Sequence, residues 1–148
     1  MLRWLFAALH LIALGIGLGA VWARARALRG PFNEAAFGRI FYADSLWGLS
    51  AILWIGTGLT RVLASMEKSA IYYMQNHLFW LKMTLLAIIL VLEIRVAMGL
   101  VRWRRQLARG ITPDTGSAGT FATISVIEAL IVIAMVFVAT GMARGYGM

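Results

Sequence analysis

Hydrophobic residues along this chain are grouped into four long runs that are separated by short polar segments. The runs cover about residues 3–23, 40–63, 72–101 and 121–142. A helix needs roughly 20 apolar residues to cross the hydrocarbon core of a bilayer, and each run reaches that length. Helix-breaking residues fall between the runs, at Gly30-Pro31 and at Pro113. The pattern therefore predicts four membrane-spanning helices.

Composition and connection lengths narrow the fold further. Hydrophobic residues make up 61% of the 148 residues and charged residues only 14%, whereas soluble domains carry about 25% charged residues. We therefore expect residues 1–148 to form a single transmembrane domain, and the short connections favour an all-α, up-down four-helix bundle. The first run has the N-terminal arginine of a signal peptide, but its length and its histidine, His10, favour a span that is retained.

Arginines are concentrated in the loops that follow the first and third runs. Basic residues collect on the cytoplasmic side of membrane proteins, so we expect both loops in the cytoplasm and both termini on the periplasmic side of a bacterial inner membrane. The same rule explains the net charge of +8. The positive charge therefore does not indicate binding to nucleic acid, and we expect no nucleic-acid partner. The loop arginines are Arg24, Arg26, Arg29, Arg102, Arg104, Arg105 and Arg109.

The chain has two histidines, and the predicted topology places both at a similar depth. His10 lies about seven residues into the first span and His77 about five residues into the third, within one helical turn of each other. These two helices run parallel and lie diagonally across an up-down bundle. Two imidazoles at one level can ligate both faces of a haem iron, so His10 and His77 are candidate axial ligands of haem b. Two alternatives stay open: one histidine binds haem or another metal, or each is hydrogen-bonded separately.

Ionisable residues within the spans are the other candidates, because charge is costly in a bilayer and usually has a function there. Lys82 either pairs with Asp44 or Glu128 inside the bundle, or receives a carboxylate or moves a proton. Lys82 and Asp44 are therefore candidate catalytic residues. From their depths alone we also predict a proton path, which would run from the cytoplasm towards the histidines through Asp44, Glu128 and Lys82.

Three further charged residues lie closer to the ends of the spans. Arg61 is at the outer end of the second span, at the depth of the histidines, where it either binds a haem propionate or reaches into the head groups. Glu93 and Arg95 lie near the inner end of the third span, and we expect them to extend towards the interface.

These candidates leave two classes of function open. One is a membrane oxidoreductase with haem b and a quinone or porphyrinogen as its redox partner. The other is a non-enzymatic bundle that forms a homo-oligomer, joins a larger membrane complex or carries a small solute. In that bundle Asp44, Lys82 and Glu128 would form a buried polar network. Copper is one such solute, because thioethers and imidazole suit it. The chain has no cysteine, which excludes thiolate metal sites. The methionines expected near His77 are Met66, Met74, Met142 and Met148.

Four stretches of the sequence carry a family likeness. They resemble small bacterial membrane proteins grouped as domain of unknown function 2214, over about residues 5–104, and this resemblance implies the four-span topology. The stretches are Leu9-His10-Leu11 with residues 15–19 and Arg24; residues 43–48 around Asp44; residues 54–59 with Arg61; and Glu67-Lys68, Tyr72-Tyr73, Asn76, residues 79–82 and Glu93.

A wider likeness rests on two shorter elements. Ala8-Leu9-His10 and Trp80-Leu81-Lys82-Met83 resemble elements of the HemJ-type protoporphyrinogen oxidases and of the membrane domain of copper-resistance protein D. That resemblance implies a haem ligand at His10 and an essential lysine at Lys82. His77 is not part of it.

Overall fold

The computed structural model describes residues 1–66 and 68–148, and within them the chain folds into helices and connecting loops. The helices are α1 (Leu2–Ala27), α2 (Glu34–Leu63), α3 (Ala70–Gln75), α4 (His77–Ala108) and α5 (Ala118–Ala143). Four of them, α1, α2, α4 and α5, are long and apolar enough to cross a membrane. The predicted all-α architecture with four spans is therefore confirmed.

The third hydrophobic run, predicted as one helix, is divided at Asn76. The Asn76 side chain accepts hydrogen bonds from the backbone N–H groups of Leu78 (2.9 Å) and Phe79 (3.3 Å) and so caps the start of α4. Its amide group also donates to the carbonyl of Tyr146 (2.9 Å). The short helix α3 therefore lies outside the spanning helix α4 and is attached to the C-terminal turn.

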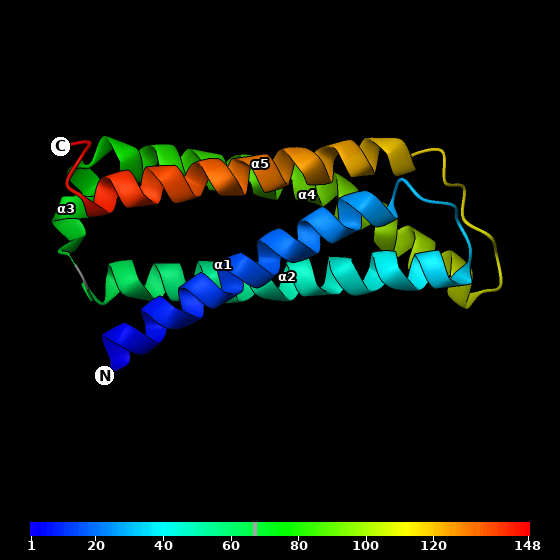
Figure 1. The fold of residues 1–148 in the computed structure, drawn as a ribbon, viewed down its shortest axis with the longest axis horizontal. Helices are drawn as coiled ribbons and strands as arrows, with labels where there is room; N and C mark the ends of the chain where they lie inside the picture. Colours follow the sequence, from blue (N-terminus) through cyan, green and yellow to red (C-terminus); the bar gives the residue numbers. More distant parts are fainter. Residues whose placement is uncertain (67) are drawn as a thin grey trace.

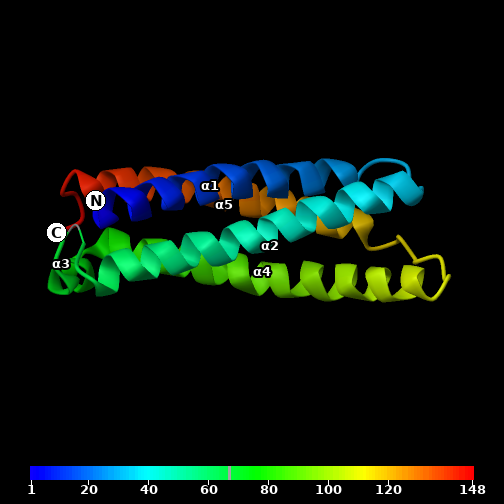
Figure 2. The same cartoon turned by 90° about the horizontal axis from the view of Figure 1, so that it is seen from below.

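The four long helices run up and down along one axis, as predicted (Figure 1). Helix α1 packs against α2 and α5, and α4 packs against α5, so α1 and α4 are diagonal (Figure 2). Both termini and α3 lie at one end, which we call the terminal end (Figure 1). The loops at residues 28–33 and 109–117 lie at the other, which we call the loop end. The assignment of the terminal end to the periplasm stays a prediction.

Apolar packing occupies the loop end and the middle of the bundle. At the loop end, Trp103 of α4 packs between Phe37 of α2 and Phe121 of α5, with ring centroids 6.0 and 5.6 Å away. In the middle, Trp47, Trp54 and Met135 belong to a second buried cluster. Towards the terminal end the helices enclose a pocket, whose wall shares Trp54 and Met135 with the second cluster.

Candidate functional site

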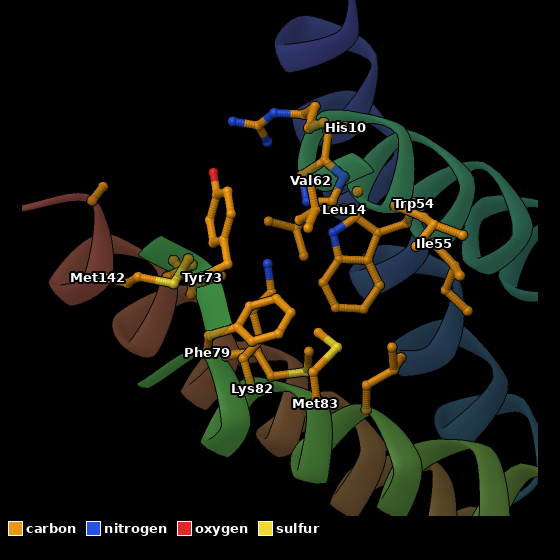
Figure 3. Close-up of a pocket in the computed structure, with 18 of the residues that line it drawn as sticks. His10, Leu14, Trp54, Ile55, Val62, Tyr73, Phe79, Lys82, Met83 and Met142 are labelled. Atoms are coloured by element: carbon orange, nitrogen blue, oxygen red, sulfur yellow. The ribbon is translucent and has the colours of Figure 1, made fainter. Parts of the chain in front are cut away.

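A cavity of about 350 Å³ lies among the helices at the terminal end (Figure 3). Its volume falls in the usual range of small-molecule sites, about 300–1,000 Å³. All of α1, α2, α3, α4 and α5 contribute to its wall, and most of the side chains are aliphatic, aromatic or thioether groups. Such a wall favours a largely apolar ligand. Apolar residues of the wall include Leu14, Ile55, Val62, Phe79, Met83 and Met135.

Three residues predicted from the sequence to form a site line this pocket together. They are His10 from α1, Arg61 from α2 and Lys82 from α4. Figure 3 shows the Lys82 side chain extending into the cavity from one wall, with His10 and Trp54 on the opposite wall. Positive groups and hydrogen-bond donors therefore face a space whose remaining lining is mostly apolar.

The ring of His10 is held by Thr57 of α2. His10 is 8% exposed, and its Nδ1 lies 2.9 Å from the Thr57 hydroxyl. That hydroxyl gives its single proton to a backbone carbonyl of its own helix, of which Leu53 O is the nearer at 2.7 Å. Thr57 therefore accepts from His10, and Nδ1 carries a proton. In the neutral ring this leaves Nε2 as the acceptor.

Gly58 allows this close approach of α1 to α2. A Cβ atom at residue 58 would lie 3.0 Å from His10 Cε1, which is closer than side chains normally tolerate. Glycine at this position therefore fixes where the imidazole lies in the pocket wall. The same addition at Gly56, one residue before Thr57, would meet nothing within 4 Å.

Trp54 supplies a buried donor to the same wall. The residue is 7% exposed, and its indole N–H donates to no acceptor among residues 1–66 and 68–148. The ring lies 5.8 Å from that of His10. A buried donor without a partner costs free energy, typically about 1–3 kcal/mol. An acceptor on a bound ligand would remove that cost.

The rim of the pocket at the terminal end is closed by bonds between α3 and the end of α5. Lys68 donates to the hydroxyl of Tyr72 (2.7 Å) and also lies over its ring, 3.9 Å from the centroid. Tyr72 in turn donates to the carbonyl of Met142 (3.1 Å). All three residues line the pocket, so the placement of α3 shapes the cavity.

His77 does not join His10 in this pocket. It is the first residue of α4, its side chain is exposed, and it is not part of the wall. Phe79, Lys82 and Met83 of α4 do line the cavity, and a residue two positions before Phe79 lies about 200° around the helix from it. The geometry therefore does not support ligation of one haem by both histidines, although the predicted diagonal placement of their helices is confirmed.

A second polar site lies towards the loop end and is centred on Arg24. Its side chain is fully buried, and each of its five N–H hydrogens has an acceptor on another helix. Nε donates to Ser125 (3.0 Å), Nη1 to Asp44 and Glu93 (both 2.9 Å), and Nη2 to Glu93 (2.8 Å) and Glu128 (2.7 Å). One residue of α1 thus binds α2, α4 and α5 at once. We call Arg24, Asp44, Glu93 and Glu128 the Arg24 cluster.

Two neighbours complete the bonds of the Arg24 cluster. Arg104 of α4 donates to the second oxygen of Asp44 (3.0 Å) and to Phe41 O (2.9 Å) of α2. Trp47 donates its indole N–H to Glu93 Oε2 (3.1 Å). These bonds join α2 to α4, which otherwise make little contact.

The Arg24 cluster corrects three expectations. Asp44 and Glu128 bind Arg24, whereas Lys82 lies in the pocket. Glu93, which was expected to extend towards the interface, turns inward to the same guanidinium. Arg24 belongs to helix α1 and not to the loop after it.

The sequence did hold a signal for the position of Arg24. Ala13, Gly17 and Ala20 are small residues at spacings of four and three, and residue 24 continues that spacing on the face of α1 that is buried in the structure. Arg24 therefore follows the face that packs on the other helices.

The two polar sites are separated by tightly packed side chains. The small space in this part of the bundle has no volume that a water molecule can occupy. This small space therefore offers no hydrated route for the predicted proton path of Asp44, Glu128 and Lys82. The residues around that space are Ala13, Leu14, Gly17, Trp47, Ser50, Ala51, Trp54 and Val132.

Four spanning helices around a side pocket and a buried ion-pair cluster define a small polytopic α-helical membrane protein. The chain belongs to the DUF2214 family of predicted membrane proteins, whose family model matches residues 2–147. This confirms the family inferred from the four sequence stretches. No curated protein and no solved structure matches the chain. In the part of the chain that the structure describes, no three histidine, aspartate or glutamate side chains form a metal site.

Proposed function

We propose that the protein binds a membrane-soluble quinone in the pocket at the terminal end. The observation that carries this proposal is the indole N–H of Trp54, a buried donor on the pocket wall with no acceptor among the described residues. A quinone brings carbonyl oxygens that accept hydrogen bonds, on a flat and otherwise apolar ring. Binding would thus satisfy the donor without burying a new unpaired group.

The arrangement of the wall supports a ligand with acceptors at two ends. Trp54 and Lys82 reach the cavity from opposite walls, on α2 and α4 (Figure 3). The two carbonyl oxygens of a quinone lie at opposite ends of one ring. Phe79 and Met83, which also line the cavity, offer flat or polarisable contact surfaces, which suit an aromatic ring.

The experiment is a binding titration in lipid nanodiscs with a short-chain quinone. We expect saturable binding to the wild-type protein. Trp54→Phe, which removes the donor and keeps an aromatic ring, should weaken binding by about 3- to 10-fold, the value of one hydrogen bond. Trp22→Phe is the matched control, because Trp22 is 48% exposed and outside the pocket. Absence of saturable binding, or equal affinity in Trp54→Phe, would reject the quinone.

Binding of haem b stays a second hypothesis, with His10 as the only histidine ligand of the iron. Metal-bound histidines usually donate their other ring N–H to a fixed acceptor, and His10 does so to Thr57. An absorption spectrum of purified protein tests it. A Soret band that His77→Ala leaves unchanged and His10→Ala removes would establish haem ligation by His10. The same samples, analysed for copper, test the copper hypothesis.

A further inference from the structure

In the Arg24 cluster, the negative charge of Glu128 is the least compensated by hydrogen bonds and solvent. Its side chain is fully buried. One oxygen, Oε2, accepts from Arg24 Nη2 (2.7 Å), but Oε1 has no hydrogen-bond partner among residues 1–66 and 68–148. A carboxylate that is buried with one bare oxygen carries a large desolvation cost. A bound proton on that carboxyl would remove the charge and most of the cost.

A second carboxyl group lies against the same nitrogen. Arg24 Nη2 also donates to Glu93 Oε2 at 2.8 Å, so Glu93 and Glu128 are bound to one atom from different helices. Two carboxylates held this close repel each other, and a single guanidinium between them does not balance both. The pair therefore favours sharing one proton.

Together with Glu128, the charged groups that face it from the other helices carry an excess of negative charge. Helix α1 contributes Arg24, α2 contributes Asp44, and α4 contributes Glu93 and Arg104. With Glu128 itself, three carboxyl groups meet two guanidinium groups. Arg104 is 38% exposed and reaches only Asp44 among the three acids. One added proton makes the Arg24 cluster together with Arg104 neutral.

We propose that the Glu93–Glu128 pair is a proton-binding site, with the proton held on the Glu128 carboxyl. Uptake forms one O–H bond on a carboxylate oxygen and breaks one O–H bond of a hydronium ion, which becomes water. Release is the reverse: the proton passes to a water molecule, which becomes hydronium, and one excess negative charge stays on the Arg24 cluster and Arg104. Glu93 and Asp44 are 23% and 16% exposed, so they connect the buried carboxyl to the outside of the bundle. Because Arg24 joins the four spanning helices, the bound proton sets the charge at their common contact.

Infrared spectroscopy of the full chain in lipid tests the proposal directly. A protonated carboxyl group has a carbonyl stretch that is distinct from the carboxylate bands and shifts in D₂O. We expect this band at neutral pH in wild-type protein, moved by ¹³C labelling of glutamate but not of aspartate. We also expect it to be lost in Glu128→Gln and kept in the control Glu34→Gln, at the exposed start of α2. No such band in folded wild-type protein would overturn the proposal, and this arm needs no variant to fold.

Thermal unfolding supplies a second readout. Glutamine resembles a protonated glutamate, so Glu128→Gln should unfold within about 2 °C of wild type at neutral pH. It should also have a smaller dependence of unfolding temperature on pH. A large loss of stability in Glu128→Gln, comparable to that of Arg24→Gln, would mean that Glu128 is ionised and would overturn the proposal. Stabilisation of wild type by Na⁺ or Li⁺ at fixed pH would likewise overturn it, by assigning the site to a metal cation.

Discussion

Arg24 and Glu93 form a two-bond ion pair across the diagonal of the bundle, with N–O distances of 2.9 and 2.8 Å. Their helices, α1 and α4, share no close backbone contact. The pair therefore bridges the bundle where direct packing of the two helices does not. A planar guanidinium can bind a carboxylate in this way, whereas a lysine ammonium cannot.

The first prediction is that Arg24→Lys strongly destabilises the protein. Lysine keeps the charge but supplies three donors where five are used. Breaking one side of a buried ion-pair network typically costs about 3–5 kcal/mol. Thermal unfolding in detergent, followed by circular dichroism, measures the loss. Arg26→Lys is the control, because Arg26 is exposed on the same helix. An equal unfolding temperature for both variants would show that the five bonds contribute little.

The second prediction concerns the independence of the two polar sites. Met135 of α5 lines the pocket with Lys82, and it lies seven residues, about 10 Å along the helix, from Glu128. We therefore expect the effects of Lys82→Met and Glu128→Gln on stability to add to within about 0.5 kcal/mol. The control pair, Arg24→Lys with Glu93→Gln, should depart from additivity by more, because these side chains bind each other. Strongly non-additive effects of Lys82→Met and Glu128→Gln on stability would contradict this prediction and support the polar network expected between the two residues.

The four spans were predictable because the length and apolar composition of a segment indicate whether it can cross a membrane. The rotation of each helix about its own axis was not, because it depends on which side chains pack. This is why the depth of His77 was estimated while its exposure on α4 was missed. The break at Asn76 was missed for a similar reason, since its side-chain bonds to α4 and to the C-terminal turn become visible only in three dimensions.

Among the site residues, too, some could be predicted from the sequence and others could not. His10, Arg61 and Lys82 were found because polar groups in apolar spans stand out, and they do line one pocket. Arg24 was assigned to a basic loop because it is followed by further arginines. The positive-inside rule treats every arginine near a span end alike, so it cannot distinguish a topogenic arginine from a buried one.

The third prediction is that Gly58→Ala weakens ligand binding with little loss of stability. The added methyl group would meet His10 Cε1 at 3.0 Å, so the ring must move within the pocket wall. Alanine itself is a better helix former than glycine, which offsets the strain. Quinone titration compares this variant with Gly56→Ala, whose methyl group would meet nothing within 4 Å. Equal binding by both variants would show that the position of His10 does not matter to the ligand.

The fourth prediction is the orientation in the membrane. The chain has no cysteine, so single cysteines can be introduced and labelled without background. With both termini in the periplasm, a membrane-impermeant maleimide should label Met148→Cys in intact bacterial cells and label Thr115→Cys only after the membrane is opened. Residue 148 is at the terminal end and residue 115 is in the α4–α5 loop. The reverse pattern would place the pocket on the cytoplasmic side, against the positive-inside rule. It would leave the Arg24 cluster and the pocket intact while exchanging the compartments that each one faces.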